Sequence, residues 1–332
     1  MKALVCGLGS IGKRHIENLE KLGFSCKDIL IYRTGKGTPT FGNNFLKEHP
    51  QHSVYYDIKE AFSHKPDITF ITNPTTFHIP LALTAAYHNS HLYIEKPISN
   101  TLEKIPELIE ATEQRNLIAY VAYNLRYHPA LQKIKELIHE KILGEIINVH
   151  AEMGERISDW HPWENHTFSY ACRKELGGGA VLTQSHEIDY LYWLFGKPEW
   201  VFAGGGTVGD LVMDVENVAS VLLKFPHFFA TLSLDYYKRP RKRYLQITGT
   251  EGRLEWNDFE GELTHYPLNK EKICFGETFQ DRNMMYLHQL EEFLNCVKHR
   301  KKPLINLYQG QDVLAIALAI KKSLAQNAVI HI

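Results

Sequence analysis

The first 120 or so residues alternate short apolar runs with amphipathic segments. The apolar runs are rich in β-branched and aromatic residues, as in strands that are buried on both faces of a parallel sheet. The segments between them place apolar residues at helical spacing over residues 11–23, 76–89 and 101–116. This repeated order of strand and helix predicts an α/β Rossmann fold with a doubly wound parallel sheet. The expected strands cover residues 2–7, 28–33, 53–56, 67–72, 91–96 and 117–122.

The pattern changes in the second half, where strand-like runs follow one another without helices between most of them. One helix is expected around residues 185–196, and two more near the end, over 283–300 and 308–327. The plan is an α+β C-terminal domain with a large, mostly antiparallel, open sheet. We expect a Rossmann domain over 1–122 and a substrate and oligomerisation domain over 123–332, with the alternative that the C-terminal helices pack back on the first domain. The expected strands of the second domain are 144–155, 199–206, 216–225, 228–237, 243–250 and 252–258.

Composition narrows the class of protein. The chain has 332 residues, of which 44% are hydrophobic and 23% charged, with a formal net charge of −1. This composition is typical of folded globular proteins, and the balanced charge gives little electrostatic reason to bind nucleic acid or anionic lipid. The five cysteines contain no C-x-x-C pair, which indicates reduced thiols. With no signal-peptide pattern and no apolar run of about 18 to 20 residues, we expect a cytoplasmic protein that does not enter a membrane.

A G-x-G-x-x-G pattern follows the first strand directly and opens the first helix. In dinucleotide-binding folds the first glycine permits a tight turn, the second lets a pyrophosphate approach the backbone, and the third lets helix and strand pack closely. The pattern alone is weak, and a chance glycine turn is the alternative. Its place between a strand and a helix favours a dinucleotide site. The residues expected to bind cofactor here are Gly7, Gly9, Ser10, Ile11 and Gly12.

The second strand ends in Arg33 and Thr34, without the Asp or Glu that commonly binds the adenosine ribose of NAD. An arginine at this position can hold a 2′-phosphate through a bidentate fork. We therefore expect NADP or NAD as cofactor, with NADP slightly favoured. The alternative is that Arg33 stacks on the adenine or lies solvated.

Four further segments carry a likeness to known enzymes. They are Asn73-Pro74-Thr75, Glu95-Lys96-Pro97, residues 123–127, and the run from Gly177 to Asp189. With these motifs in this order, the chain resembles the glucose–fructose oxidoreductase, inositol dehydrogenase and MocA (Gfo/Idh/MocA) family over essentially its whole length. The resemblance implies an NAD(P)-dependent oxidoreductase. It adds further expected cofactor-binding residues, namely Asn73, Pro74, Thr75, Glu95 and Lys96.

Lys96 and His186 are the expected catalytic residues. Lys96 stands at the carboxyl end of a parallel strand, where open α/β sheets bind ligands, and the proline after it allows a cis peptide bond that would turn Lys96 toward the crevice. A lysine of lowered pKa can exchange the substrate's hydroxyl proton, and a charged one can stabilise an oxyanion. The resemblance implies that His186 faces the same hydroxyl, and the near-neutral pKa of histidine suits proton exchange. The competing interpretations are a surface lysine at a strand end and a packed or surface histidine.

The resemblance also suggests which residues bind the substrate. An interdomain ion pair is an equal alternative for Arg126, and Asp189, one helical turn after His186, could orient its imidazole or form a cap or salt bridge. Many family members carry an aspartate where this chain has Thr183. Since threonine cannot act as a base at neutral pH, proton transfer falls on Lys96 and His186. The expected substrate-binding residues are Tyr123, Asn124, Arg126, Trp163, Arg173, Thr183 and His186.

These residues predict hydride transfer between nicotinamide and a hydroxyl or keto group of a sugar or sugar derivative. Nucleotide-linked and acidic sugars of surface-polysaccharide biosynthesis are among the candidates. The alternative is a non-catalytic sensor or regulator that binds cofactor and sugar, which Thr183 favours and the retained Lys96 and His186 oppose. The sequence has neither an H-E-x-x-H motif nor a Cys/His cluster, so we expect no metal. The uncovered face of an open antiparallel sheet needs to be buried, and a second copy of the chain can bury it. We therefore expect a homodimer or homotetramer through the C-terminal sheet.

Overall fold

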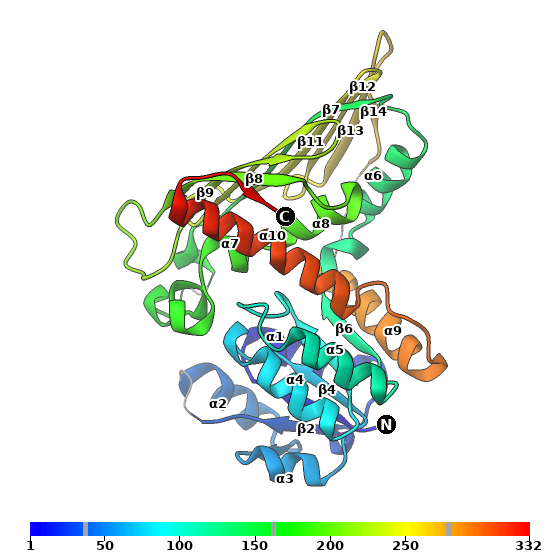
Figure 1. Cartoon of the computed structure of the whole chain (residues 1–332). Helices are drawn as coiled ribbons and strands as arrows, with labels where there is room; N and C mark the ends of the chain where they lie inside the picture. The colour runs from blue at the N-terminus through cyan, green and yellow to red at the C-terminus, as the bar shows by residue number, and fades with distance from the viewer. Residues whose placement is uncertain (36–38, 161, 163, 277–280) are drawn as a thin grey trace. The chain divides into compact units, whose positions relative to one another are not determined.

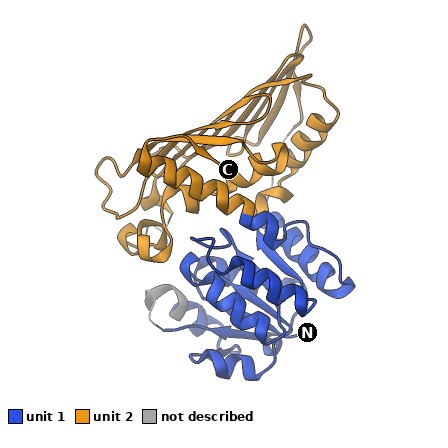
Figure 2. Cartoon of the chain, in the orientation of Figure 1, with its two compact units in different colours: residues 1–123, 283–311 blue, residues 124–282, 312–332 orange. Residues whose placement is uncertain are grey.

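The computed structural model describes residues 1–35, 39–160, 162, 164–276 and 281–332, and the chain forms two compact units (Figure 2). Unit 1 comprises residues 1–123 and 283–311, and unit 2 comprises residues 124–282 and 312–332. We expected a division between residues 122 and 123, with the alternative that the C-terminal helices pack back on the first domain. In the structure the division falls one residue later, and residues 283–311 return to unit 1 as that alternative stated, whereas residues 312–332 belong to unit 2.

Unit 1 is built around a six-stranded parallel sheet in the order β3-β2-β1-β4-β5-β6 (Figure 1). Every residue of β1, β4, β5 and β6 is buried, as expected of strands covered on both faces. The predicted doubly wound α/β fold is therefore confirmed. The strands are β1 (Ala3–Cys6), β2 (Ile29–Tyr32), β3 (Ser53–Tyr55), β4 (Ile68–Ile71), β5 (His91–Glu95) and β6 (Ala119–Ala122).

The helices of unit 1 pack in pairs, α1 beside α9 and α4 beside α5. The sequence pattern indicated these four but not α2 or α3, and α3 is only six residues long. No helix in the described ranges is long and apolar enough to span a bilayer. The helices are α1 (Ser10–Lys21), α2 (Pro39–Glu48), α3 (Ile58–Ser63), α4 (His78–Tyr87), α5 (Ile105–Gln114) and α9 (Asn283–His299), with short 3-10 turns η1 (Cys26–Asp28) and η2 (Thr75–Phe77).

A cluster of buried aromatic rings attaches α9 to the sheet of unit 1. The rings of Tyr93 and Tyr120 stack with their centroids 5.4 Å apart, and Phe293 of α9 meets Tyr93 edge-on at 5.3 Å. The Tyr93 hydroxyl also donates a hydrogen bond to Gln289 at 2.6 Å. Because aromatic pairs of this geometry add to the burial of their apolar area, α9 belongs with the first sheet although it lies 160 residues after β6 in the sequence.

Unit 2 holds a nine-stranded sheet in the order β14-β13-β12-β11-β7-β10-β9-β8-β15. β7 and β10 are parallel neighbours and the other pairs are antiparallel, which confirms the predicted mixed, mostly antiparallel sheet. Six of the strands were predicted, and the pattern did not indicate β13, β14 or β15. The strands are β7 (Ile146–Gly154), β8 (Trp200–Gly206), β9 (Val218–Lys224), β10 (Phe229–Asp235), β11 (Lys242–Gly249), β12 (Gly252–Asn257), β13 (Glu262–Pro267), β14 (Ile273–Cys274) and β15 (Ile330–His331).

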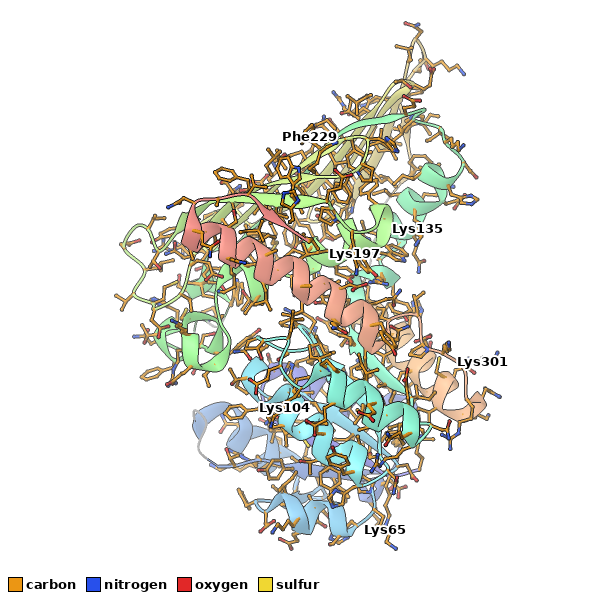
Figure 3. All side chains as sticks on the ribbon, in the orientation of Figure 1. Lys65, Lys104, Lys135, Lys197, Phe229 and Lys301 are labelled. Atoms are coloured by element: carbon orange, nitrogen blue, oxygen red, sulfur yellow. The ribbon has the colours of Figure 1, made fainter. Side chains whose placement is uncertain are left out.

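One face of this sheet is covered by helices and the other is exposed. Buried and exposed residues alternate along β9 and β10, so that Ala230, Leu232 and Leu234 point to the covered face. Phe229 is 41% exposed and lies on the side of the sheet opposite α10 (Figure 3). Oligomerisation through this open face stays a prediction. The helices are α6 (Pro129–His139), α7 (Ala180–Thr183), α8 (His186–Phe195) and α10 (Leu307–Gln326), with 3-10 turns η3 (Asn124–Tyr127), η4 (Ile157–Asp159), η5 (His166–Phe168), η6 (Tyr170–Cys172) and η7 (Lys174–Leu176).

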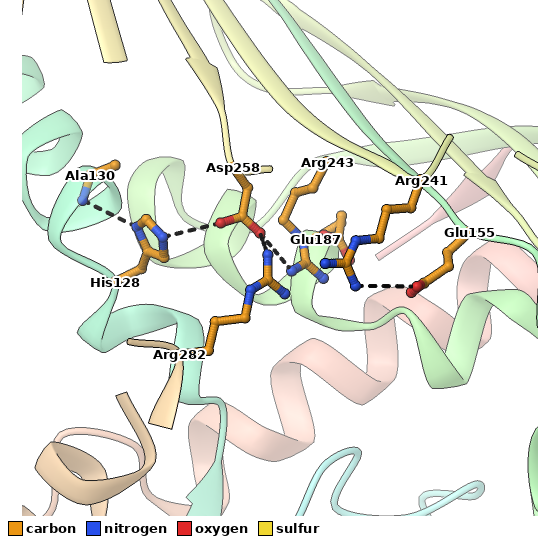
Figure 4. A network of polar contacts seen from close by, with 8 residues as sticks. All are labelled: His128, Ala130, Glu155, Glu187, Arg241, Arg243, Asp258 and Arg282. Atoms are coloured by element: carbon orange, nitrogen blue, oxygen red, sulfur yellow. Dashed lines mark hydrogen bonds and ion pairs between the residues drawn. The ribbon is translucent and has the colours of Figure 1, made fainter. Parts of the chain in front are cut away.

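A network of charged side chains joins α8 to the sheet of unit 2 (Figure 4). Arg243 of β11 donates from Nε to Glu187 at 2.7 Å and from Nη1 to Asp258 at 3.2 Å. Asp258 also accepts a hydrogen bond from Arg282 at 3.1 Å, and His128 Nε2 lies 3.2 Å from its other oxygen. Two carboxylates thus face two guanidinium groups, so the charges buried here are paired.

The neighbours of Asp258 set its protonation. Burial by itself would raise the pKa of this carboxyl group. The contact with His128 and the charges of Arg243 and Arg282 outweigh burial and hold the pKa of Asp258 well below its usual range. A carboxyl group whose pKa is lowered on folding stabilises the protein above its unfolded-state pKa of about 4, and this contribution is lost as the pH falls.

We therefore expect Asp258→Asn to lower the free energy of unfolding by about 3 kcal/mol at pH 7, because the substitution removes a counter-charge from buried Arg243 and from partly exposed Arg282. The difference between wild type and variant should shrink as the pH falls below about 4. Urea unfolding followed by tryptophan fluorescence at several pH values measures both effects. The control is Asp210→Asn, since the Asp210 side chain is 77% exposed. An Asp258→Asn effect that is equal at pH 7 and pH 3 would contradict this account.

Candidate active site

Four segments singled out in the sequence meet at one edge of the unit 1 sheet. The glycine loop follows β1, Arg33 follows β2, Asn73 lies just beyond β4, and Lys96 follows β5. These strands are parallel neighbours in the order β2-β1-β4-β5, so their carboxyl ends share one edge, where doubly wound sheets bind ligands. The structure thus gathers there all the residues expected to bind cofactor, which are Gly7, Gly9, Ser10, Ile11, Gly12, Arg33, Thr34, Asn73, Pro74, Thr75, Glu95 and Lys96.

The three glycines of the loop have different surroundings. Gly7 has a φ of +110°, and a Cβ atom there would lie 3.0 Å from the Thr72 carbonyl group. A Cβ atom on Gly12 would collide with the Gly7 carbonyl oxygen. At Gly9, in contrast, a Cβ atom would meet nothing within 4 Å. The chain's own packing therefore requires glycine at 7 and 12, whereas at 9 a side chain would occupy open space beside the loop.

The open space lies at the N-terminal end of α1. Gly9 is the N-cap residue and offers no side chain to cap the helix, and the first turn holds no acidic residue. The first amides of a helix have no partners within the helix, and together with the helix dipole they attract an anion. The loop therefore fits the pyrophosphate of a dinucleotide, with Gly9, Ser10 and Ile11 nearest to it.

Lys96 is the one side chain of its segment that reaches the surface. Of residues 91–99, all of which the structure describes, only Lys96 is partly exposed and the others are buried. The peptide bond between Lys96 and Pro97 is cis, as the sequence analysis allowed. The lysine therefore emerges from a buried segment at the edge of the sheet that carries the glycine loop.

A buried histidine of α1 fixes the residue before Lys96. His15 is fully buried, and its Nε2 atom lies 2.8 Å from Oε1 of Glu95. The other oxygen of Glu95 accepts a hydrogen bond from the backbone N–H of Lys96 at 3.2 Å. Glu95, which we expected to bind cofactor, thus holds the backbone of Lys96 in place through this hydrogen bond.

A second buried histidine fixes the residue after Lys96. His78 opens α4, and its two ring nitrogens each lie 2.8 Å from a backbone carbonyl oxygen, one of Pro97 and one of Asn73. Burial lowers the pKa of His78, and the hydrogen bonds to both carbonyls oppose that shift. His78 therefore ties the loop after β4 to the loop after β5. Sequence reasoning identified neither His15 nor His78, since an isolated histidine in a helical pattern carries no local signal of its partner.

In unit 2, His186 begins α8. Of residues 180–191, every one of which is described, only His186 is partly exposed and the rest are buried. Lys96 and His186, the two residues expected to be catalytic, are therefore each the accessible member of an otherwise buried segment of their own unit.

Asp189 binds Arg126 within unit 2, which is the salt bridge that stood among the alternatives for Asp189. Arg126 is fully buried and donates to both oxygens of Asp189, with distances of 2.7, 3.1 and 3.2 Å. Burial raises the pKa of Asp189, and Arg126 opposes that shift. The ion pair of Arg126 thus lies inside unit 2, whereas the alternative was a pair between domains. Substrate binding by Arg126 stays a prediction.

Thr183 is buried in the packing of α7. Its hydroxyl donates a hydrogen bond to the Gly179 carbonyl at 2.8 Å and contacts the hydroxyl of Tyr236, whose pKa is raised by burial. These bonds give Thr183 a structural role in α7, and its contact with substrate stays a prediction.

The other expected substrate residues have varied surroundings. Tyr123 and Asn124, the last residue of unit 1 and the first of unit 2, are both buried. Arg173 is exposed enough to reach solvent and forms an ion pair with Glu175. Trp163 lies outside the described residues.

Comparison with known proteins agrees with this architecture. Residues 1–123 match the oxidoreductase family with an NAD-binding Rossmann fold, and residues 131–255 match the GFO/IDH/MocA C-terminal domain. The chain is 25% identical over 344 residues to myo-inositol 2-dehydrogenase of Thermotoga maritima, covering 98% of this chain and 97% of that protein. It is 25% identical over 270 residues to the NADP(+) D-xylose 1-dehydrogenase of Haloarcula marismortui, covering 77% of this chain and 72% of that protein.

Solved structures share the fold over the whole chain. The WlbA dehydrogenase from Bordetella pertussis in complex with NADH and UDP-GlcNAcA has a TM-score of 0.85 at 18% identity, covering 100% of this chain and 98% of that one. Levoglucosan dehydrogenase in complex with NADH and levoglucosan has a TM-score of 0.84 at 19% identity, covering 100% of this chain and 99% of that one. With a glycine loop, a Rossmann sheet and both family domains in place, the chain belongs to the GFO/IDH/MocA family of NAD-binding oxidoreductases.

Proposed function

We propose that this protein transfers a hydride between NAD(P) and a hydroxyl or keto group of a sugar or sugar derivative. The observation that supports the proposal most directly is the position of Lys96, a partly exposed lysine at the same sheet edge as the glycine loop. The glycine loop would hold the pyrophosphate, Arg33 would meet the adenosine ribose, and Asn73 to Thr75 would line the remaining part of the site. When bound, the nicotinamide supplies the hydride acceptor or donor.

The protein's own residues handle the proton. When an alcohol is oxidised, the carbon loses a hydride and the hydroxyl oxygen loses a proton, and Lys96 accepts that proton. In the reverse direction Lys96 donates a proton to the oxygen of the carbonyl that becomes an alcohol. We assign His186 to the same proton transfer, as the second titratable side chain. Thr183 and Asp189 take no part, because the first is bonded to Gly179 and the second to Arg126.

The substrate class follows from the relatives together with this chemistry. Named relatives act on a cyclitol, on xylose and on levoglucosan, and one neighbour of the same fold was solved with a UDP-linked sugar acid. We infer a polyhydroxylated ring as substrate, and nucleotide-linked or acidic sugars as the first extension to test. The first test is absorbance of reduced nicotinamide with each of these sugars and both cofactors. A panel in which neither cofactor changes its redox state would count against the proposal.

Replacement of Lys96 tests the proposed chemistry directly. Lys96→Met should lower kcat with the active sugar by about 10²- to 10⁴-fold, because the proton acceptor is lost. His186→Asn should also lower kcat, and the double variant should lose much less than the product of the two single losses, as residues of one proton-transfer step do. Lys59→Met, at an exposed lysine of α3, is the control. Near-normal turnover of Lys96→Met would overturn the assignment.

Replacement of Arg33, which follows the second strand, tests whether the protein prefers NADP or NAD. If Arg33 holds a 2′-phosphate, Arg33→Ala should weaken NADP binding by about tenfold or more and leave NAD binding within about threefold. Lys27→Ala is the matched control, because Lys27 is an exposed cation at the opposite end of the same strand. Fluorescence titration with both reduced cofactors measures the affinities. Much tighter binding of NAD than NADP by the wild type would reject the Arg33 argument.

The glycine loop offers a paired test. Gly9→Ala should fold normally, since its Cβ atom meets nothing within 4 Å, yet lose about tenfold or more in cofactor affinity because the methyl group occupies the space for the pyrophosphate. Gly12→Ala should instead lower the free energy of unfolding by about 1 to 3 kcal/mol, since its Cβ atom collides with the Gly7 carbonyl. Thermal unfolding and cofactor titration separate the two effects. If the two variants lost stability and cofactor affinity to the same extent, the glycine loop would not be the cofactor-binding site.

A further inference from the structure

We propose that Glu20, His49 and His52 form a binding site for a divalent transition-metal ion of the Zn²⁺ class. Glu20 lies in the last turn of α1, His49 directly follows α2, and His52 directly precedes β3. One ligand atom from each of the three lies within 4.8 Å of the others. The inference is independent of the proposed oxidoreductase function, and none of its residues belongs to the site described above.

The surroundings of His52 are the main evidence for a bound ion. Its side chain is fully buried, yet neither ring nitrogen makes a hydrogen bond. Its Nε2 atom lies 3.3 Å from Oε1 of Glu20, close enough for an ion pair but not aligned for a hydrogen bond. Buried polar atoms of folded proteins almost always have a partner, and an exception calls for a missing ion or water. The unaligned approach of the two groups is what an ion between them would produce.

The spacing agrees with a tetrahedral ion. Zinc binds imidazole nitrogen at about 2.0 to 2.1 Å and carboxylate oxygen at about 2.0 to 2.2 Å, so two ligand atoms on one edge of the tetrahedron lie roughly 3.3 to 3.5 Å apart. The gap of 3.3 Å between His52 Nε2 and Glu20 Oε1 equals such an edge. His49 is only partly buried, so its ring can rotate and bring a nitrogen to a third corner of the tetrahedron.

The surroundings suit a bound ion. The ring of Phe45, itself buried, stacks on His49 at 4.3 Å and lies 6.1 Å from His52, which gives the two imidazoles an apolar wall. The side-chain amide of Gln51 lies 3.5 Å from Nδ1 of His49, where it can orient the ring through the nitrogen that does not bind the metal. Two imidazoles and one carboxylate favour Zn²⁺, Co²⁺ or Ni²⁺ over Mg²⁺ or Ca²⁺, and water would supply the fourth ligand.

The cluster is separate from the cofactor site. Glu20 follows Ser10 by ten residues along α1, which at a rise of about 1.5 Å per residue places it roughly 15 Å from the glycine loop. The ion would take no part in the proposed hydride transfer, but the proposal departs from our expectation, based on sequence motifs, that the protein holds no metal. The ion would instead join the end of α1 to the segment between α2 and β3. Sequence reasoning missed the cluster because Glu20 lies far from the histidine pair and no zinc motif covers the spacing.

The experiment is titration of the purified full-length protein with Zn²⁺ and, as a spectroscopic probe, Co²⁺. We expect one ion per chain, the intense visible absorption of tetrahedral Co²⁺, and a rise in melting temperature on addition of Zn²⁺. His49→Ala and Glu20→Gln should each weaken binding by about tenfold or more and abolish the rise. Both residues are partly exposed, so these variants should fold even where His52→Ala does not. His299→Ala removes an exposed histidine of the same unit and should change nothing.

Two results would overturn the proposal. One is wild-type protein that binds no Zn²⁺ beyond the weak, non-stoichiometric uptake of exposed histidines. The other is Zn²⁺ affinity that is the same in His49→Ala and Glu20→Gln as in the wild type. Either result would leave the cluster as a contact between Glu20 and His52 that binds no ion. Sugar oxidation is assayed separately, so failure of this proposal and failure of the oxidoreductase proposal are distinguishable.

Discussion

Every residue proposed to bind cofactor or move a proton in unit 1 depends on one constraint, the parallel alignment of the strands. Parallel strands all end at the same edge, so the loops after β1, β2, β4 and β5 come together without any further contact between them. The order β2-β1-β4-β5 also places the glycine loop beside the loop after β4, where the direction of winding reverses. Each of these loops alone would be an ordinary turn. Because all of them lie at the same edge of the sheet, together they form one candidate cofactor site.

Alignment alone does not fix Lys96, because a residue after a strand end is free to move with its loop. Two histidines from different helices remove that freedom, His15 through the carboxylate of Glu95 and His78 through the carbonyl of Pro97. Both are buried, so their hydrogen bonds do not compete with water and are costly to break. The backbone on each side of the lysine is thereby held, while its own side chain remains accessible. This is the arrangement that a proton-transferring group needs, since small errors in position lower the rate steeply.

The fold class followed from local patterns, but the supports of the site did not. Buried parallel strands differ from their neighbours in composition, and a glycine loop has a fixed spacing, so both are visible in a single stretch of sequence. The partners of His15, Asp189 and Glu187 lie 80, 63 and 56 residues away, and no local signal encodes such pairs. For the same reason the sequence left a salt bridge of Asp189 as one of several alternatives and did not identify Arg126 as its partner. The return of α9 to unit 1 depends on the ring contacts of Phe293, which are equally non-local.

The surroundings of His186 in unit 2 differ from those of Lys96 in unit 1. The first turn of α8 buries two carboxylates, Glu187 and Asp189, and each is paired with a buried arginine, Arg243 or Arg126. A buried charge is tolerated only with its counter-charge, so the helix can dock in only one position, with both pairs formed. The same pairing cancels most of the charge that these carboxylates would otherwise present to His186. Thr183, whose hydroxyl is bonded to the Gly179 carbonyl, adds no charge to this helix. Within residues 180–191 the titratable side chain that stays accessible is that of His186, and under the proposed function this accessibility is what lets an imidazole exchange a proton with a substrate.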